Sequence, residues 1–334
     1  NSMLNQSVYF LSGFLLSVCL TFGAVKLLGC VGFWDIPNHR SMHKKATPTS
    51  GGITIGISYW IAICLSQFEV DFLWPWLITS SAYLVIGALD DFQSRTVSLR
   101  LFLQISIGSI LAAWLIFNTT SKGDDVLKLV TVIILFSIFM VGAVNLFNFM
   151  DGSDGLAASQ SAVYFLLHAY LFNTVDEVEL TILAIVLCGI VSGFLVFNWS
   201  PAKIFMGDSG SYFLGSICVS FAFFSYEKGL GVYPSLILAS PFLCDSILTL
   251  VHRFFSGESW WEAHRSHVYQ ILLSHGLSPS RLILALMVLH FFFLGPLFFF
   301  SMEYPALSFY CTMTAFGTMG FICYYLRKLY SGTV

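Results

Sequence analysis

Long apolar stretches separated by short polar connections make up almost the whole chain. A helix needs about 20 mostly apolar residues to cross the hydrocarbon core of a bilayer. On that measure the pattern predicts roughly eleven transmembrane helices, and we treat residues 1–334 as a single integral-membrane domain. The expected spans are residues 7–30, 51–67, 72–90, 98–117, 127–147, 156–173, 179–197, 209–226, 233–252, 281–300 and 306–326.

The composition agrees with an all-α polytopic membrane protein. Of 334 residues, 57% are hydrophobic and only 10% are charged, with a mean hydropathy of +0.81. A soluble domain carries about 25% charged residues. The eight cysteines lie singly, without a CxxC pair, so neither a zinc site nor a disulfide framework is predicted.

The basic residues predict the orientation in the membrane. If the spans alternate, the longer polar connections all fall on one side, together with 12 of the 15 Lys and Arg residues. Only Lys122, Lys128 and Lys228 fall on the other side. The positive-inside rule then places the long connections in the cytoplasm, the N-terminus outside and the C-terminus inside.

The most informative segment is a polar cluster, Asn145–Gly155, set directly between two apolar stretches. Hydrocarbon does not tolerate unpaired amides and carboxylates, so such a cluster indicates a functional site. Carboxylate and amide oxygens are hard ligands that suit Mg²⁺ or Mn²⁺. Asp151 and Asp154 would share one face if the next helix started here. Helix capping explains either Asp alone, but not their combination with Asn145 and Asn148.

Two adjacent acids, Asp90 and Asp91, end another predicted span. The C-terminal end of a helix carries partial negative charge, so acids there need a compensating cation or basic partner. Paired carboxylates attract a divalent cation or share a proton, and Arg95 and Arg100 follow closely. The alternative is a surface ion pair between Asp91 and Arg95, about one turn apart. The unfavourable helix end favours the cation.

The segment 198–211 contains Gly-Asp-Ser-Gly-Ser at the start of a further predicted span. Free N–H groups at the helix start would lie beside the Asp208 carboxylate, which suits a metal-bound phosphate. Phe205 could stack on a nucleobase, and Asn198 and Lys203 are further candidate substrate contacts. A plain helix N-cap is equally consistent with this segment.

Two long loops add basic groups on the same side. The first combines Lys45 with a Thr-Pro-Thr-Ser-Gly-Gly turn, which suits a phosphate, although lipid headgroups are an alternative partner. In the last, His264 and His267 flank Arg265 and could grip a pyrophosphate. Within that loop, residues 253–263 are the candidate sugar-selective surface.

Three titratable side chains fall inside predicted spans. Asp245 could support the site from within the bundle. His168 and His290 lie nearer the outer halves and are expected to be packing residues.

Clustered acids, amides, glycine-rich helix starts, basic groups and an aromatic thus converge on one face. These residue types are typical of enzymes that catalyse Mg²⁺-dependent phosphoryl transfer, in which positioning and charge neutralisation supply most of the catalysis. A membrane enzyme of this type would join a soluble phosphorylated donor to a lipid acceptor.

Five motifs follow one another along the chain: D-x-P-N-x-R-S-x-H…T-P-x-x-G-G, D-D, N-x-x-N-x-x-D-G-x-D-G, N-x-x-P-A-K-x-F-M-G-D-x-G-S and H-R-x-H-x-Y-Q. In this order they resemble the polyprenyl-phosphate N-acetylhexosamine-1-phosphate transferases, the bacterial glycosyltransferase family 4. The muramoyl-pentapeptide branch carries adjacent histidines in the last loop, whereas two residues separate His264 from His267 here. The chain therefore looks most like the undecaprenyl-phosphate N-acetylglucosaminyl 1-phosphate transferase branch.

The resemblance implies a reaction. A UDP-N-acetylhexosamine, such as UDP-GlcNAc, UDP-FucNAc or UDP-QuiNAc, would give its sugar 1-phosphate to undecaprenyl phosphate and release UMP. The product would initiate O-antigen or other cell-envelope polysaccharide synthesis at the bacterial cytoplasmic (inner) membrane. Partners would be the two substrates and the lipid bilayer, with a homodimer as an open alternative and no nucleic acid.

The resemblance also implies residue roles. Asp208 would bind Mg²⁺, or Mn²⁺ as a substitute, with Asn148 as a second contact. Asp154 and Phe205 match uracil contacts. The catalytic candidates are Asp90, Asp91, Asp151, Asp208, His264 and His267. The substrate-binding candidates are Lys45, Arg95, Arg100, Asn148, Asp154, Asn198, Lys203, Phe205 and Arg265, with Arg100 and Arg265 on the pyrophosphate.

Asp90 and Asp91 match the acidic pair of the family near the lipid phosphate. A phosphate monoester has a second pKa of about 6, so the acceptor is largely a dianion at neutral pH. It needs alignment more than a general base. We therefore expect direct attack on the β-phosphorus rather than an aspartyl-phosphate intermediate.

Two alternative functions stay open. One is the muramoyl-pentapeptide phosphotransferase of peptidoglycan synthesis. The other, from a different class, is a secondary transporter, whose site would lie near the bilayer midplane between inverted repeats. No residue visibly reads C4 or C6 of the sugar, so the donor is not fixed by the sequence.

Overall fold

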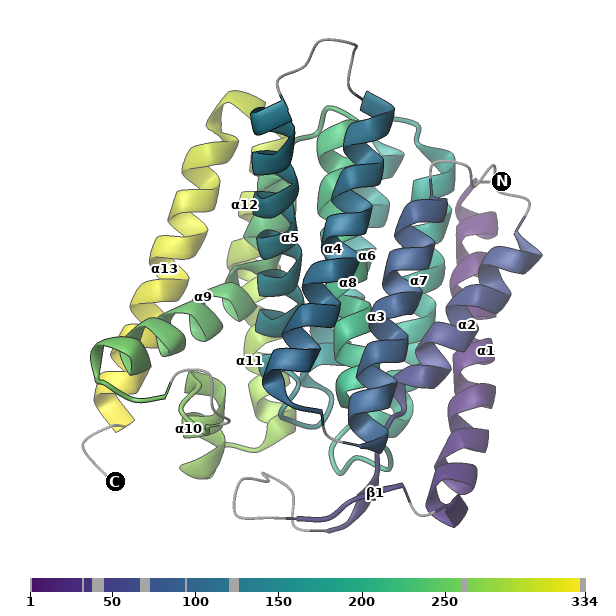
Figure 1. Cartoon of the computed structure of the whole chain (residues 1–334), viewed down its shortest axis with the longest axis vertical. Coiled ribbons are helices and arrows are strands. Elements are labelled where there is room, and N and C mark those ends of the chain that lie inside the picture. The colour runs from purple at the N-terminus through teal and green to yellow at the C-terminus, as the bar shows by residue number, and fades with distance from the viewer. Residues whose placement is uncertain are drawn as a thin grey trace.

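Helices account for nearly all of the chain in this computed structural model, which describes residues 2–31, 33–37, 45–66, 73–93, 95–119, 126–259 and 264–330. The long helices run roughly along one axis, so the bundle has two distinct ends (Figure 1). The helices are α1 (Ser2–Val31), α2 (Gly52–Leu65), α3 (Trp74–Phe92), α4 (Val97–Thr119), α5 (Val126–Phe149), α6 (Leu156–Asn173), α7 (Val178–Asn198), α8 (Gly207–Glu227), α9 (Tyr233–Phe255), α10 (Val268–Ser274), α11 (Pro279–Leu289), α12 (Gly295–Glu303) and α13 (Ser308–Tyr330).

Each predicted span coincides with a helix in the described part of the chain, and seven segments there are long and apolar enough to cross a membrane. These seven are α1, α4, α5, α7, α9, α11 with α12, and α13. By contrast, α2 has only 14 residues, or about 21 Å at 1.5 Å per residue, against about 30 Å of hydrocarbon. The chain is thus an almost entirely helical polytopic membrane protein, and the number eleven stays a prediction.

One predicted span is locally irregular. Between α11 and α12, residues His290–Leu294 form a π-helical turn, η1. Pro296 lies two residues after this turn, and its missing N–H and bulky ring disturb the regular hydrogen-bond ladder of an α-helix. The helix continues through this turn, so α11, η1 and α12 form one rod.

A small pair of strands departs from the all-α expectation. Strands β1 (Trp34–Asp35) and β2 (Thr47–Pro48) are antiparallel, with Trp34 opposite Pro48 and Asp35 opposite Thr47. The Phe205 N–H also donates to the Pro48 carbonyl at 2.8 Å. The first long loop is therefore tied to the loop that precedes α8.

The connections expected to carry the chemistry gather at one end of the bundle. The described parts of the loops before α2, α4, α6, α8 and α10 all lie at the bottom of Figure 1, which we call the loop end. The C-terminal end of α13 also lies there, while α1 begins at the opposite end. The predicted gathering of long connections on one side is thus present in the fold.

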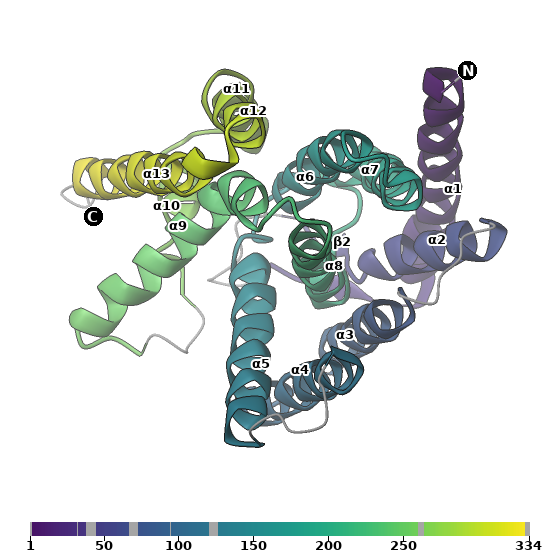
Figure 2. The same cartoon turned by 90° about the horizontal axis from the view of Figure 1, so that it is seen from above.

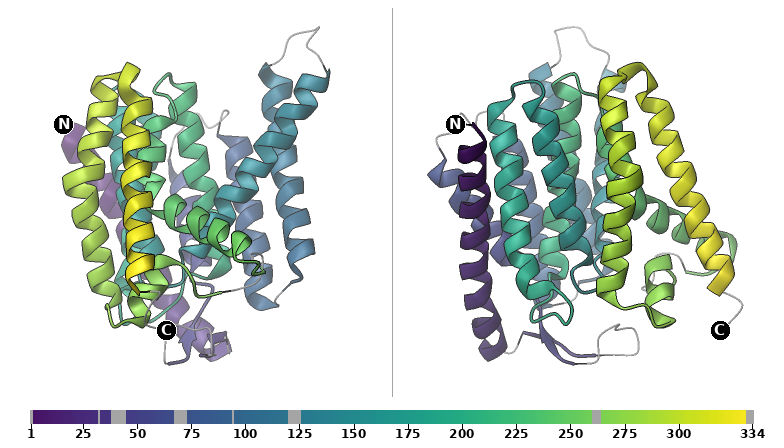
Figure 3. Two further views of the ribbon diagram at one scale, coloured as in Figure 1. Left: turned by 90° about the vertical axis from the view of Figure 1, so that its left-hand side faces the viewer. Right: turned by 180° about the vertical axis from the view of Figure 1, so that it is seen from behind.

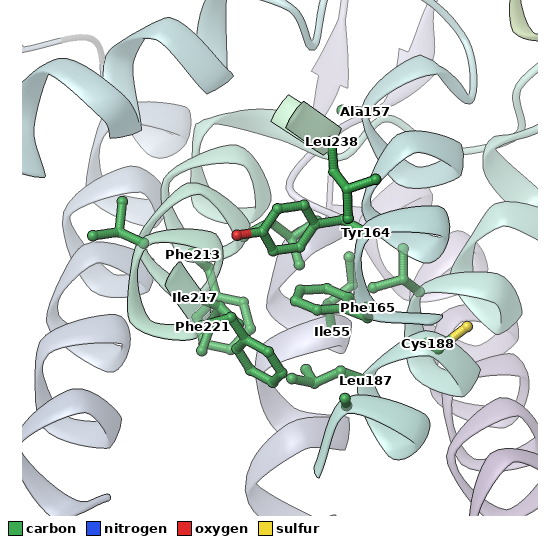
Figure 4. Packing of buried hydrophobic residues seen from close by; sticks show 14 of the residues in the cluster. Ile55, Ala157, Tyr164, Phe165, Leu187, Cys188, Phe213, Ile217, Phe221 and Leu238 are labelled. Carbon is green, nitrogen blue, oxygen red and sulfur yellow. The ribbon is translucent and has the colours of Figure 1, made fainter. Parts of the chain in front are cut away.

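Helix α8 is the centre of the bundle, surrounded by α2, α3, α5, α6 and α9 (Figure 2). Its side chains Phe213, Ile217 and Phe221 interlock with Phe165 of α6 (Figure 4). In a lipid bilayer there is no hydrophobic driving force for helix association, so close van der Waals packing of this kind stabilises the bundle. Gly87 of α3 allows a close approach to α8, since a Cβ there would lie 2.2 Å from the Asp208 carbonyl oxygen. The start of α8 is thereby held against the end of α3.

The C-terminal helices form a second group beside this centre. Helix α9 projects away from the bundle at its C-terminal half, and α13 crosses behind it (Figures 1 and 3). The short α10 packs against both α9 and α13. The described part of the last long loop is consequently positioned by α9 and α13.

Candidate active site

The start of α8 is capped by an acid from another helix. Asp91, at the end of α3, accepts hydrogen bonds from the Asp208 N–H at 2.8 Å and the Ser209 N–H at 3.1 Å. This contact satisfies the unpaired N–H groups of one helix and the acid at the unfavourable end of the other. The expectation that these two N–H groups are free for a phosphate is therefore wrong. The alternative considered for Asp91, an ion pair with Arg95, is replaced by this contact with α8.

A glycine makes this contact sterically accessible. The helix begins at Gly207, whose φ of +73° is strained for any residue with a Cβ. A Cβ there would also lie 2.6 and 2.8 Å from the two carboxylate oxygens of Asp91. Because α8 begins at Gly207, with Met206 at the N-cap position, Asp208 lies in the first turn of the helix and is not its N-cap residue.

Asp90 is buried and is held by a cation. It accepts from the Arg95 backbone N–H at 2.7 Å and from Nη1 of Arg100 at 2.9 Å. The same Nη1 lies 4.0 Å from Oδ2 of Asp208. Arg100 thus stands between two carboxylates, and it supplies the compensating charge that the acidic pair needs.

The polar loop after α5 brings a further acid to this cluster. Burial, followed by the neighbouring carboxylates of Asp208 and Asp91, raises the pKa of Asp151 well above its usual value. Within the described residues its carboxylate has no hydrogen bond or ion pair. Because α6 begins only at Leu156, the expectation that Asp151 and Asp154 share a helix face is wrong. Asp154 instead accepts from the Ala202 N–H at 3.1 Å.

The asparagines of the motifs hold the loops in place. Ser211 donates to Oδ1 of Asn148 at 2.6 Å, and Asn145 donates to Oε1 of Gln104 at 2.6 Å. Asn198 is buried and bridges two loops, since its amide accepts from the Gly155 N–H and donates to the Ile204 carbonyl. The Ser211 hydroxyl also lies 3.4 Å from the Asp208 backbone carbonyl, so Asn148 is linked to the start of α8.

Asp90, Asp91, Asp151 and Asp208 together form what we call the acid cluster. Its chemistry fits a divalent cation that is also bound by the phosphates of a substrate. No three His, Cys, Asp or Glu side chains among the described residues gather as a ready-made metal site. Mg²⁺, however, is commonly held by one or two carboxylates, with water and substrate phosphates completing its shell. Burial and the nearby carboxylate of Asp208 raise the pKa of Asp151, and Arg100 is already paired with Asp90. The uncompensated negative charge suits such an ion.

The last loop forms a second part of the site. The rings of His264 and His267 lie 4.8 Å apart between centroids, and His264 bonds the Ser266 hydroxyl at 2.9 Å. Burial, then the positive surroundings of His267 and Arg253, lower the pKa of His264 to about 4. His264 is therefore neutral at pH 7, and an anion bound beside it would favour its cationic form.

A tyrosine joins the two parts. The Tyr269 hydroxyl donates to the Phe149 carbonyl at 3.0 Å, directly before the loop that carries Asp151. A Cβ at Gly152 would lie 2.1 Å from the same hydroxyl. The Phe149 ring also lies 5.8 Å from the His267 ring. Residues 264–267, which we call the histidine loop, thus lie next to the acid cluster.

The remaining candidates lie at the loop end with fewer contacts to the acids. Lys45, Lys203, Arg95 and Arg265 are exposed, and Phe205 is partly buried. No ion pair joins Lys45 or Lys203 to the acid cluster among the described residues. Residues 260–263, which include both tryptophans of the proposed sugar-selective surface, lie outside the described residues.

Several residues of the site were not foreseen. The Tyr212 hydroxyl is buried beside the acids and Arg100, and no described residue forms a hydrogen bond with it. Ser211 reaches Asn148, and Thr249 and Arg327 support the histidine loop. Tyr212 could have been found from the sequence, because it lies one helical turn after Asp208 and so on the same face of the helix. Nothing in the sequence pairs Arg327, some 60 residues away, with the loop.

Comparison with known proteins places this geometry in context. Residues 73–226, from α3 to α8, match glycosyl transferase family 4. The chain is 28% identical over 295 residues to a probable undecaprenyl-phosphate N-acetylglucosaminyl 1-phosphate transferase of Bacillus subtilis, covering 84% of this chain and 80% of the relative. It is 24% identical, with the same coverage, to an undecaprenyl-phosphate alpha-N-acetylglucosaminyl 1-phosphate transferase of Yersinia pestis.

Another branch is similar over a shorter region. A phospho-N-acetylmuramoyl-pentapeptide-transferase of Anoxybacillus flavithermus is 33% identical over 227 residues, which cover 62% of this chain and 69% of the relative. The names of these relatives thus agree on the transfer of a phospho-sugar and differ in the sugar.

Proposed function

The chain belongs to glycosyl transferase family 4, and on that premise we propose that it transfers N-acetylhexosamine 1-phosphate from a UDP-sugar to undecaprenyl phosphate. It is a multi-pass membrane protein and a polyprenyl-phosphate sugar-phosphate transferase. The finer assignment, with UDP-GlcNAc or a related UDP-N-acetylhexosamine as donor, is our proposal. The product would initiate O-antigen or another cell-envelope polysaccharide at the bacterial inner membrane.

The observation that carries this proposal is the acid cluster at the start of α8. Arg100 stands 2.9 Å from Asp90 and 4.0 Å from Asp208 there, and burial together with the neighbouring Asp208 carboxylate raises the pKa of Asp151. Alternating charges of this kind suit a pyrophosphate and its divalent cation, because the acids attract the ion and the guanidinium attracts phosphate oxygens.

The proposed reaction is a single displacement. An oxygen of the lipid phosphate forms a bond to the β-phosphorus of the UDP-sugar, and the bond from that phosphorus to the bridging oxygen breaks. UMP leaves with the electron pair. No proton has to be removed from the attacking group, since a phosphate monoester is largely a dianion at neutral pH, with a second pKa of about 6.

The chain's own residues would position the two phosphates. Asp208, with Asn148 as a second contact, would hold Mg²⁺, which neutralises the charge that develops on the leaving phosphate. Arg100 would move from Asp90 toward a phosphate oxygen. Asp91 fixes the start of α8 and so the position of the Asp208 carboxylate.

The donor would extend toward the last loop. His264 and His267 lie beside Phe149, next to the acid-bearing loop. A pyrophosphate bound there would raise the pKa of His264 from about 4 and favour its cationic form. Asp154 and Phe205, on adjoining loops, are the proposed uracil contacts.

Two alternatives are ranked lower. A muramoyl-pentapeptide donor is supported by the 33% identity to that branch, but the match covers only 62% of this chain, against 84% for the N-acetylglucosaminyl type. A secondary transporter would place its polar site near the middle of the bundle. The acid cluster of this chain lies at one end.

UMP release is the test of the proposal. Purified protein with Mg²⁺ and undecaprenyl phosphate is given UDP-GlcNAc, UDP-GalNAc, UDP-FucNAc, UDP-QuiNAc or UDP-MurNAc-pentapeptide. We expect UMP from an N-acetylhexosamine donor, and release from the pentapeptide donor alone would move the chain to the muramoyl branch. Absence of turnover with every donor, in protein that remains folded, contradicts the proposal.

Two variants test the site within this assay. Asp208→Asn should abolish metal-dependent turnover without unfolding the protein, whereas Asp176→Asn, in an exposed loop at the opposite end, should keep it. Full activity of Asp208→Asn would remove Asp208 as the metal ligand. A phosphorylated enzyme trapped from UDP-sugar without lipid would overturn the single displacement.

A further inference from the structure

The last turn of α13 makes a direct contact with the histidine loop. Nη2 of Arg327 donates to the Ser266 carbonyl at 2.7 Å, between His264 and His267. The same nitrogen donates to the Thr249 hydroxyl on α9. Helix α13 is therefore bonded to the loop and to the helix that precedes it.

A buried acid continues this network beneath the loop. The Thr249 hydroxyl donates to Oδ1 of Asp245 at 3.2 Å, and both residues are buried. Asp245 also accepts from the Val268 N–H at 2.7 Å and the Tyr269 N–H at 3.0 Å, so it caps α10. Its Oδ1 lies 3.7 Å from Nδ1 of His267.

The charge balance explains why an arginine occupies position 327. A buried carboxylate is costly unless hydrogen bonds and an opposite charge compensate it. Two N–H groups and one hydroxyl bond Asp245 directly, and Arg327 adds a positive charge through Thr249. The planar guanidinium can serve the carbonyl and the hydroxyl together, which an ammonium on a flexible stem does less well.

We propose that Arg327 is a positioning residue that sets the histidine loop for the pyrophosphate of the donor, through Ser266 and through Thr249 and Asp245. This rests on the proposed function of His264 and His267. The C-terminal helix would thereby control one substrate selectively. The acceptor side, at the Asp90 and Asp91 pair, is held by α3 and by the start of α8 and does not share these bonds.

Kinetics with separate substrates are the first test. Arg327→Met should raise the KM for the UDP-sugar about tenfold, because a hydrogen bond to a charged group is worth about 1.5 kcal/mol or more. The KM for undecaprenyl phosphate should change less than about twofold. Arg327→Lys should restore part of the loss, and Lys328→Met, at the exposed neighbouring position, is the matched control.

Thr249 tests the route of the effect. Thr249→Val removes the hydroxyl and keeps the shape, so it should raise the donor KM, while Thr249→Ser should resemble wild type. In the double variant with Arg327→Met, the two losses should be less than additive, because both act in one network. Additive losses would overturn the route through Thr249.

Hydrogen exchange gives a readout that does not need turnover. In Arg327→Met the amides of Val268 and Tyr269 should exchange faster than in wild type and in Lys328→Met, with the α3 and α8 amides unchanged. Unchanged exchange at these two amides overturns the inference, even if the enzyme releases UMP as proposed. Faster exchange with an equal rise of both KM values, or with none, shows a merely structural role and also overturns it.

Discussion

Replacing Gly207 by alanine should disable the site with little effect on the rest of the fold. Gly207 has a φ of +73°, and the new Cβ would lie 2.6 Å from one carboxylate oxygen of Asp91 and 2.8 Å from the other. The carboxylate therefore has to move. Its hydrogen bonds to the N–H groups of Asp208 and Ser209 would then lengthen or break.

The expected magnitude follows from these contacts. An L-residue in the left-handed conformation costs about 1–2 kcal/mol, and each hydrogen bond to a charged group contributes about 1.5–3 kcal/mol. The lower values sum to about 4 kcal/mol for one conformational penalty and two lost bonds. If this cost is felt whenever the competent site forms, turnover falls about 10³-fold.

Two other glycines separate the contributions. Gly229 has a φ of +77° with nothing within 4 Å of its added Cβ, so Gly229→Ala tests the backbone conformation alone. Gly142, within α5, has open space and no unusual φ, so Gly142→Ala tests the substitution itself. We expect a lower thermal midpoint but normal UMP release for Gly229→Ala, and no loss for Gly142→Ala.

The assay compares UMP release per folded molecule, with the folded fraction measured by size-exclusion chromatography and thermal unfolding. Turnover of Gly207→Ala within about threefold of the Gly229→Ala value would refute the reasoning. It would mean that the Asp91 cap is not needed to hold Asp208 in place.

Three further outcomes can be checked by thermal unfolding. His264 has a pKa of about 4 in the folded protein against about 6.5 when unfolded. Between these values the unfolded state binds more protons, so the free energy of unfolding should fall as the pH drops from about 6.5 to about 4. This fall should be smaller in His264→Gln, and an identical fall would contradict the lowered pKa. Tyr212→Phe should keep or raise the midpoint, because the hydroxyl has no partner among the described residues; a clearly lower midpoint would show that the hydroxyl is bonded in the native protein. His168→Ala should lower the midpoint, since its ring bonds Tyr164 and Ser235 at 2.8 Å, yet it should leave UMP release per folded molecule near wild type; a large loss of turnover would give the outer half a role in catalysis.

The helices were predictable because apolar length is a strong local signal. Each expected span coincides with a helix, and the loops with chemistry gather at one end, as the alternation predicts. The π-helical turn before Pro296 and the pairing of β1 with β2 were not predicted. Both depend on contacts or backbone adjustments that a count of apolar residues does not capture.

The site was predictable as a set of residue types and less so as a set of partners. The need of Asp90 and Asp91 for compensation followed from the helix dipole, and Arg100 provides it for Asp90. That Asp91 would instead bind the N–H groups of α8 required the approach of α3 to α8 at Gly87, which is a tertiary fact. For the same reason the sequence could not link Arg327 with Ser266.

The opposite positions of the two chain ends have a practical consequence. The start of α1 and the end of α13 lie at opposite ends of the bundle, and both helices are long and apolar enough to cross a bilayer. In a sealed vesicle, an affinity tag on one end would then be protected from added protease while a tag on the other end is cleaved. Because the catalytic loops share the end of α13, the fraction of molecules cleaved at a C-terminal tag would equal the fraction whose active sites face the added substrate. Rates measured in vesicles could be corrected for insertion sidedness on the same sample.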